Sequence, residues 1–182
     1  MEPSKENRPR ESASPSPRSE PMSPTLYLVQ NGVLLLEDDR THLSTVVDVF
    51  NTVFKVPSKI IVPYYVDPAA SLETTTQNVR EIISQKISAS GSSFAGVVTD
   101  FQVSPFFSSL DVWKAIEEGM VGTPYAVDWV KTCRILMTAA AKNSPEIRHA
   151  TQAGIIDTCI EKPFGLSTLR TALTEAIHKR VS

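Results

Sequence analysis

Several features that mark familiar protein classes are scarce in this sequence or missing from it. The 182 residues include only two cysteines, Cys133 and Cys159, too few for a disulfide framework and without the CxxC spacing of a zinc site. Apolar runs such as 33–36 are far too short to cross a bilayer, which takes about 20 apolar residues. The first residues contain no apolar stretch of the kind that signal peptides have. We therefore expect a protein of a reducing compartment, located in the cytoplasm.

The sequence also lacks an excess of charge of either sign. It has 18 Lys and Arg against 20 Asp and Glu, which gives a formal net charge of −2. A near-neutral balance argues against nucleic-acid binding by charge alone. No GxxxxGK[ST] motif occurs, which excludes a P-loop nucleotide enzyme. Neither nucleic acid nor a membrane is expected as a partner.

The first 24 residues have no Leu, Ile, Val or aromatic residue but contain six Pro and six Ser. Such a composition cannot bury enough apolar surface to offset the entropy of ordering, so residues 1–24 are predicted to be a disordered Ser/Pro-rich tail. Its three Ser-Pro pairs are either targets of a proline-directed kinase or simple polar filler. Residues 25–182 are long enough to form one domain.

Apolar and amphipathic segments alternate through the rest of the chain. Amphipathic stretches with helical spacing separate the short apolar runs, which is typical of an α/β protein with a doubly wound parallel sheet and helices on both faces. The second strand is expected to end early because Pro63 follows it. The five predicted strands are 33–36, 60–62, 94–99, 134–137 and 155–160.

Two helical patches, 110–118 and 125–131, lie between the third and fourth strands, where one helix would suffice. Either the first patch is the regular helix and 121–132 is extra, or 106–120 is an inserted helical segment and 122–131 is the regular helix. We favour the second alternative because Gly122 precedes an apolar stripe.

Chemically active residues stand where four of the predicted strands end. Glu37 and Asp38 follow the first strand, Asp100 the third, Thr138 the fourth and Lys162 the fifth. The carboxyl ends of parallel strands meet at one edge of the sheet, where ligands bind. Clustered carboxylates repel one another unless a cation neutralises them, and Mg²⁺ prefers such oxygen ligands. An aspartate placed there can act as a nucleophile that forms an aspartyl phosphate.

The segments LLLEDD, GVVTD, ILMTAA and IEKPF, in this order on successive strands, resemble the receiver domain of two-component response regulators. The resemblance covers about 26–182 and implies a stand-alone, flavodoxin/CheY-like receiver with strand order 2-1-3-4-5. It makes Asp100 the phosphoacceptor, and Glu37 and Asp38 the acidic pair that holds Mg²⁺ together with Asp100 and the backbone carbonyl of Gln102. The side chain of Gln102 is a candidate for orienting a hydrolytic water.

The same resemblance assigns Thr138 as the switch hydroxyl and Lys162 as the lysine beside the phosphate. It implies that the peptide bond before Pro163 is cis. The phosphodonor would be a histidine kinase or a histidine phosphotransfer protein. A downstream protein would bind the helix 4–strand 5–helix 5 face, which here consists of the helix after the fourth strand, the fifth strand and the last helix. Such a domain is a signalling phosphoacceptor and not an enzyme, beyond its own phosphorylation and dephosphorylation.

Some features depart from the receiver pattern. In many receivers an aromatic residue stands three positions before the lysine, whereas this chain has Cys159 there. The aromatic-rich segment 101–107 forms either a lid or, as we favour, core for the inserted helix. One alternative is therefore a pseudo-receiver, a phosphorylation-independent protein-interaction module. A second is a Mg²⁺-dependent phosphohydrolase, which usually carries DxD on its first strand.

Two further expectations concern helices. Asp39 is predicted to be either the N-cap or a first-turn residue of the helix after the first strand, where it complements the helix dipole, rather than a metal ligand. The three histidines, His42, His149 and His178, are expected on helices without paired partners, as surface or internally satisfied residues.

Overall fold

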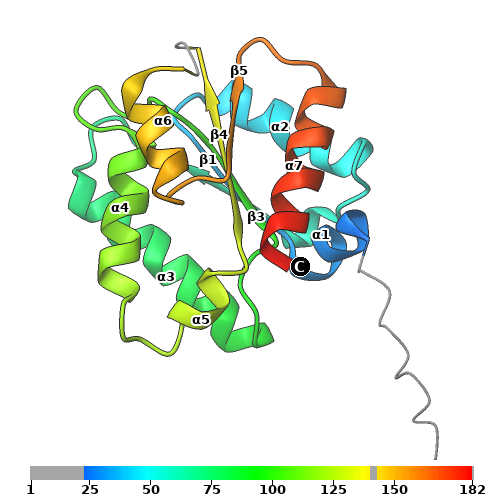
Figure 1. The fold of residues 1–182 in the computed structure, drawn as a ribbon, viewed down its shortest axis with the longest axis horizontal. Helices are drawn as coiled ribbons and strands as arrows, with labels where there is room; N and C mark the ends of the chain where they lie inside the picture. Colours follow the sequence, from blue (N-terminus) through cyan, green and yellow to red (C-terminus); the bar gives the residue numbers. More distant parts are fainter. Residues whose placement is uncertain (1–22, 140–142, 182) are drawn as a thin grey trace, which may run out of the picture.

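The structure, a computed structural model, describes residues 23–139 and 143–181, so most of the predicted tail lies outside the described residues. The strands form one parallel sheet in the order β2-β1-β3-β4-β5, which confirms the predicted fold class (Figure 1). Their bounds are β1 (Val33–Glu37), β2 (Ile61–Tyr65), β3 (Gly96–Asp100), β4 (Cys133–Thr138) and β5 (Thr158–Glu161). The helices are α1 (Pro24–Asn31), α2 (Arg40–Thr52), η1 (Ser58–Ile60), α3 (Leu72–Ser90), α4 (Ser109–Met120), α5 (Ala126–Trp129), α6 (Pro145–Gln152) and α7 (Leu166–Val181).

Side chains of the inner strands alternate between two apolar layers, one on each face of the sheet. Val33 and Leu35 of β1 pack with α1, α2 and α7, whereas Leu34 and Leu36 pack with α3, α4 and α6. Figure 1 shows the same two helical layers on opposite sides of the strands. Because β1 is buried on both faces, its sequence is continuously apolar and shows no alternation.

The strand order places the functional edge of the sheet. From β1 the chain moves outward to β2 and then returns to β3 on the other side of β1. The order therefore reverses between β1 and β3, and the carboxyl ends of these two strands flank the crevice where open α/β sheets bind ligands.

The prediction that β2 ends before Pro63 is wrong, since the strand runs on to Tyr65 with Pro63 paired to Leu35. β2 is an edge strand with β1 as its neighbour, so a residue without an N–H is tolerated there. Two other strands differ from the prediction by less. β3 begins at Gly96 and β5 at Thr158, each later than predicted.

The favoured alignment of the two helical patches is also wrong. The first patch forms α4, a twelve-residue helix that buries Val112, Trp113 and Ile116, whereas the second forms only the four-residue α5. A capping box fixes the start of α4, since the Ser108 side chain accepts from the Asp111 N–H and the Asp111 carboxylate accepts from the Ser108 N–H. The extra element is therefore the segment around α5.

Sequence analysis did not predict helix α1, which packs against α7 through the buried Leu28. Gly32 ends this helix with a φ of 78°, and a Cβ at that position would lie 2.3 Å from the Ile60 carbonyl oxygen. Only glycine fits such a close approach in the left-handed region.

Across residues 23–139 and 143–181, none of the helices is both long and apolar enough to cross a membrane.

Candidate functional site

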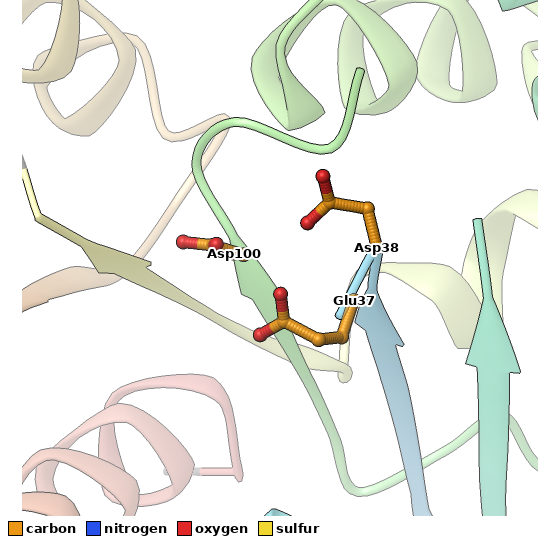
Figure 2. Close-up of side chains that lie close together, drawn as sticks. All are labelled: Glu37, Asp38 and Asp100. Carbon is orange, nitrogen blue, oxygen red and sulfur yellow. The ribbon is translucent and has the colours of Figure 1, made fainter. Parts of the chain in front are cut away.

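Three carboxylates meet at the carboxyl ends of β1 and β3. One oxygen each from Glu37, Asp38 and Asp100 lies within 4.8 Å of the other two, and Figure 2 shows the three side chains together at these strand ends. Glu37 is almost fully buried, with 2% of its surface exposed, whereas Asp38 and Asp100 are partly exposed. The structure thus brings together the three acidic residues that the sequence singled out.

Lys162 joins this cluster from the loop after β5. Its ammonium nitrogen lies 3.0 Å from Asp100 Oδ2 and 3.5 Å from Glu37 Oε2. The backbone N–H of Lys162 donates to the Thr138 carbonyl at 2.6 Å, which ties the loop to the end of β4. The Lys162–Pro163 peptide bond is cis, as the resemblance implied. Two carboxylates that come from different strands therefore share one ammonium group.

The Asp100 carboxylate is also fixed by its own loop. Its Oδ1 accepts a hydrogen bond from the backbone N–H of Phe101 at 2.8 Å, while Oδ2 faces Lys162. Asp100 is the last residue of β3 and pairs with Met137 of β4, so the sheet register sets its height at the edge. An aspartate held in this way presents a fixed carboxylate to a pocket of about 480 Å³.

Asp39 has the first of its two predicted structural roles, that of N-cap. Its Oδ1 accepts from the backbone N–H groups of Thr41 at 2.7 Å and His42 at 2.9 Å, which caps α2. These hydrogen bonds favour the charged form and lower the pKa of Asp39. The same cap places His42 at the third helical position, in the first turn of α2.

His42 contradicts the expectation that the histidines have no paired partners. Its Nδ1 contacts Glu37 Oε2 and lies 3.0 Å from Lys162 Nζ. The side chain of a helical residue leans toward the N-terminus of the helix, so a first-turn histidine reaches back to the strand end. The Asp39 cap followed three residues later by His42 was the available sequence signal.

Burial and like charge both act on Glu37. Desolvation raises its pKa most strongly, and the negative charge of Asp100 raises it further, while Lys162 and His42 oppose both effects. Burial is thus the main reason why the charged form of Glu37 is disfavoured. The count of charges is a separate observation: three carboxylates face one ammonium group and one imidazole, which leaves room for a cation.

The donor set fits a hard divalent cation. Three carboxylate oxygens from Glu37, Asp38 and Asp100 lie close enough to share one ion, and oxygen ligands are those that Mg²⁺ prefers. The pocket is lined by these residues together with Asp39, His42, Gln102 and Lys162. Gln102 thus stands at the pocket, but its side-chain amide donates to the Ser104 carbonyl, and a metal-binding role for its own carbonyl stays a prediction.

Thr138 ends β4 at the same edge, where it pairs with Glu161 of β5. Its surface is only 1% exposed, so its hydroxyl lies inside the fold rather than at the pocket surface. The role as a switch hydroxyl stays a prediction. Cys159, the position where many receivers have an aromatic residue, is a partly buried cysteine that packs on the α3–α4–α6 side of the sheet.

The segment after Asp100 is core for the most part. Val103 and Phe107 are buried and Phe101 packs against the same apolar layer, as favoured from the sequence. Phe106 differs, because 83% of its surface is exposed.

Comparisons with known proteins agree with this fold. No protein-family model and no curated protein matches the sequence. Among solved structures, the chain is similar to the BeF3-activated DrrB receiver domain, with a TM-score of 0.50, 18% identity and coverage of 80% of this chain and 96% of that one. A signal receiver domain assigned to a Luxo repressor of Vibrio parahaemolyticus is also similar. Its TM-score is 0.50 and its identity 16%, with coverage of 83% of this chain and 92% of that one.

A third similar structure is titled as an adenylate cyclase from Rhodopirellula baltica. It has a TM-score of 0.54 and 14% identity and covers 81% of this chain and 87% of that one. At such low identities the likeness shows the fold alone. The chain has the fold of receiver domains, and its chemistry must be argued from its own residues.

Proposed function

We propose that this chain is a response-regulator receiver that accepts a phosphoryl group on Asp100. The observation that carries the proposal is the arrangement of three carboxylates within 4.8 Å of one another with Lys162 Nζ 3.0 Å from Asp100 Oδ2. This arrangement lies at the point where the strand order reverses, and the similar folds of receiver domains support the same interpretation.

In the proposed reaction a carboxylate oxygen of Asp100 attacks the phosphorus of a phosphohistidine on a histidine kinase or histidine phosphotransfer protein. The new P–O bond forms as the P–N bond breaks, and the imidazole leaves with the electron pair of the P–N bond. Lys162 supplies an ammonium beside the position where negative charge accumulates on the phosphoryl oxygens. A divalent cation held by Glu37, Asp38 and Asp100 would neutralise more of that charge.

Phosphorylation would act as a switch through the local change in charge. The phosphoryl group replaces the single negative charge of the carboxylate with about 1.5 to 2 negative charges, and it adds acceptor oxygens. Lys162 and Thr138, joined by the 2.6 Å backbone hydrogen bond, would follow this charge and move the ends of β4 and β5. The face that α6, β5 and α7 form would then change its affinity for a downstream protein. A groove of about 350 Å³ between α6 and β5 supports this choice of face.

The test is phosphorylation by acetyl phosphate in the presence of Mg²⁺, followed by intact-mass measurement. The wild-type protein should gain the mass of one phosphoryl group, and Asp100→Asn should gain none. Asp48→Asn, the same change on the exposed side of α2, is the matched control and should behave as wild type. A wild-type protein that gains no mass from acetyl phosphate or from a phosphorylated phosphotransfer protein would instead favour the pseudo-receiver alternative.

A further inference from the structure

His42 lies at the point where the two charged parts of the site meet. Its Nδ1 contacts Glu37 Oε2, the oxygen that Lys162 approaches to 3.5 Å, and Nδ1 is itself 3.0 Å from the lysine nitrogen. The imidazole is 30% exposed and borders two pockets, the acidic one and an apolar one of about 650 Å³ between α2 and the loop after β5. Neither the acidic cluster nor the proposed phosphoryl transfer requires a histidine at this place.

The two oxygens of Glu37 have different surroundings. Oε2 is held by His42 and Lys162, whereas Oε1 accepts one long hydrogen bond within the described residues, from the backbone N–H of Asp39 at 3.4 Å. With its proton on Nδ1, the imidazole donates to Oε2 and anchors that oxygen to α2, and Nδ1 then does not accept a hydrogen bond from the nearby Lys162 ammonium. One oxygen is thereby fixed by the protein, and the other remains available to a cation.

Glutamate needs such an anchor more than aspartate does. Its side chain has one more rotatable bond, so an unanchored Glu37 would sample several positions for its carboxylate at the end of β1. Fixing those positions when a cation binds costs conformational entropy. A hydrogen bond from the first turn of α2 removes that cost before the cation arrives, as residues behind metal-binding carboxylates commonly do.

We infer that His42 is a positioning residue for the cation site, which holds the Glu37 carboxylate so that its second oxygen faces Asp38 and Asp100. The inference rests on the proposed function because it needs the acidic cluster to bind a cation. Lys162 cannot replace His42 in this role, since its ammonium lies nearer to Asp100 Oδ2, at 3.0 Å, than to Glu37. Without His42, the contact left to Glu37 Oε2 among the described residues is the weaker one with the lysine.

The experiment measures binding of Mn²⁺ to the unphosphorylated full chain by electron paramagnetic resonance, where the signal of free Mn²⁺ falls as the ion binds. His42→Ala should weaken the affinity by about 10- to 100-fold. His42→Asn should keep most of the wild-type affinity for Mn²⁺. The amide nitrogen of asparagine lies about as far from the backbone as Nδ1 of histidine, and it also donates a hydrogen bond. His149→Ala, on the exposed side of α6, is the control and should bind as wild type.

Each outcome has a distinct meaning. An unchanged affinity in His42→Ala would overturn the inference while leaving the proposed function intact, and a higher affinity would show that the imidazole competes with the ion for Glu37. Equal losses in His42→Ala and His42→Asn would also overturn it, because the hydrogen bond would then not be the cause. A wild-type protein that binds no Mn²⁺ would remove the cation site itself, and the inference with it. Circular dichroism on each variant separates these results from loss of the fold.

Discussion

Two clusters of charged residues lie at opposite ends of the sheet, and they are built in opposite ways. At the amino ends of β4 and β5, the buried carboxylate of Asp157 accepts from the Arg134 backbone N–H at 2.8 Å and from Arg180 Nε at 2.8 Å, with Lys179 at 3.7 Å. At the carboxyl ends of β1 and β3, three carboxylates share one lysine and one histidine. The first cluster has more cations than carboxylates, and the second has fewer.

The difference separates a structural cluster from the candidate functional site. Each oxygen of Asp157 has a donor, and Arg134 in turn pairs with Glu117 and donates to the Gly154 carbonyl, so the network links α4, β4, the loop before β5 and α7. Burial lowers the pKa of Arg134 to about 10, which still leaves it charged near neutral pH. At the other end of the sheet, the pKa of Glu37 is raised, mainly by burial and further by the negative charge of Asp100. A titratable group perturbed by burial and by a like charge is typical of functional sites.

The largest expected effect comes from breaking the balanced cluster. Asp157→Ala leaves the Arg180 guanidinium and the Arg134 N–H without their acceptor, which should lower the free energy of unfolding by about 3 kcal/mol. Urea denaturation measures this loss. Asp48→Ala, on the exposed side of α2, is the control and should change it little. A loss as small as the control's would mean that Asp157 does not hold the network together.

A smaller effect of opposite sign is expected at the unbalanced cluster. With a chelator present, Glu37→Gln should raise the free energy of unfolding by about 1 kcal/mol, because it removes one of three repelling carboxylates. Since the pKa of Glu37 is raised, the folded protein keeps a proton that the unfolded chain has already lost. Wild-type stability should therefore fall as pH rises above the usual glutamate pKa, and this fall should be weaker in the variant.

The same variant should lose stabilisation by metal. Mg²⁺ at ten times its dissociation constant should stabilise the wild type by about 1.4 kcal/mol and Glu37→Gln by much less. Thermal unfolding with and without Mg²⁺ measures both effects. A variant that is less stable than wild type in chelator would show that Glu37 is already neutralised by its neighbours.

The smallest effect is expected from Lys179→Ala. Lys179 lies 3.7 Å from Asp157 Oδ1, and its side chain is 59% exposed, so the pair should contribute only about 0.3 kcal/mol. Arg180→Ala removes the less exposed partner, which lies 2.8 Å from Asp157 Oδ1. This change should lower the free energy of unfolding clearly more than Lys179→Ala does in the same urea titration. Equal losses would show that exposure does not decide which cation stabilises the cluster.

Much of the candidate site could be predicted from the sequence because its residues end continuous apolar strands. Glu37, Asp38, Asp100 and Lys162 each follow such a run, and parallel strands bring their ends together whatever the intervening segments do. The contact of His42 with Glu37 could not be predicted in this way, since it depends on the residue at which α2 begins and on the direction of a side chain. The Asp39 cap sets both.

The errors in the fold have similar causes. Pro63 stops a strand only where its missing N–H would have faced a neighbour, and the sequence of a strand does not show whether the strand lies at an edge. The choice between the two helical patches depended on packing against α3, although Ser108 and Asp111 already offered a capping signal for α4. Local patterns predicted which elements exist, and tertiary contacts decided their bounds.

Helix α1 has a practical consequence for how this domain can be joined to other proteins. Because α1 packs against α7, residue 23 and residue 181 lie on the same side of the molecule, close to the amino ends of the strands (Figure 1). Fluorescent reporters fused beyond both positions would emerge near one another and away from the acidic pocket. Energy transfer between such a pair would report on the docking of α1 without obstructing access to the acidic pocket.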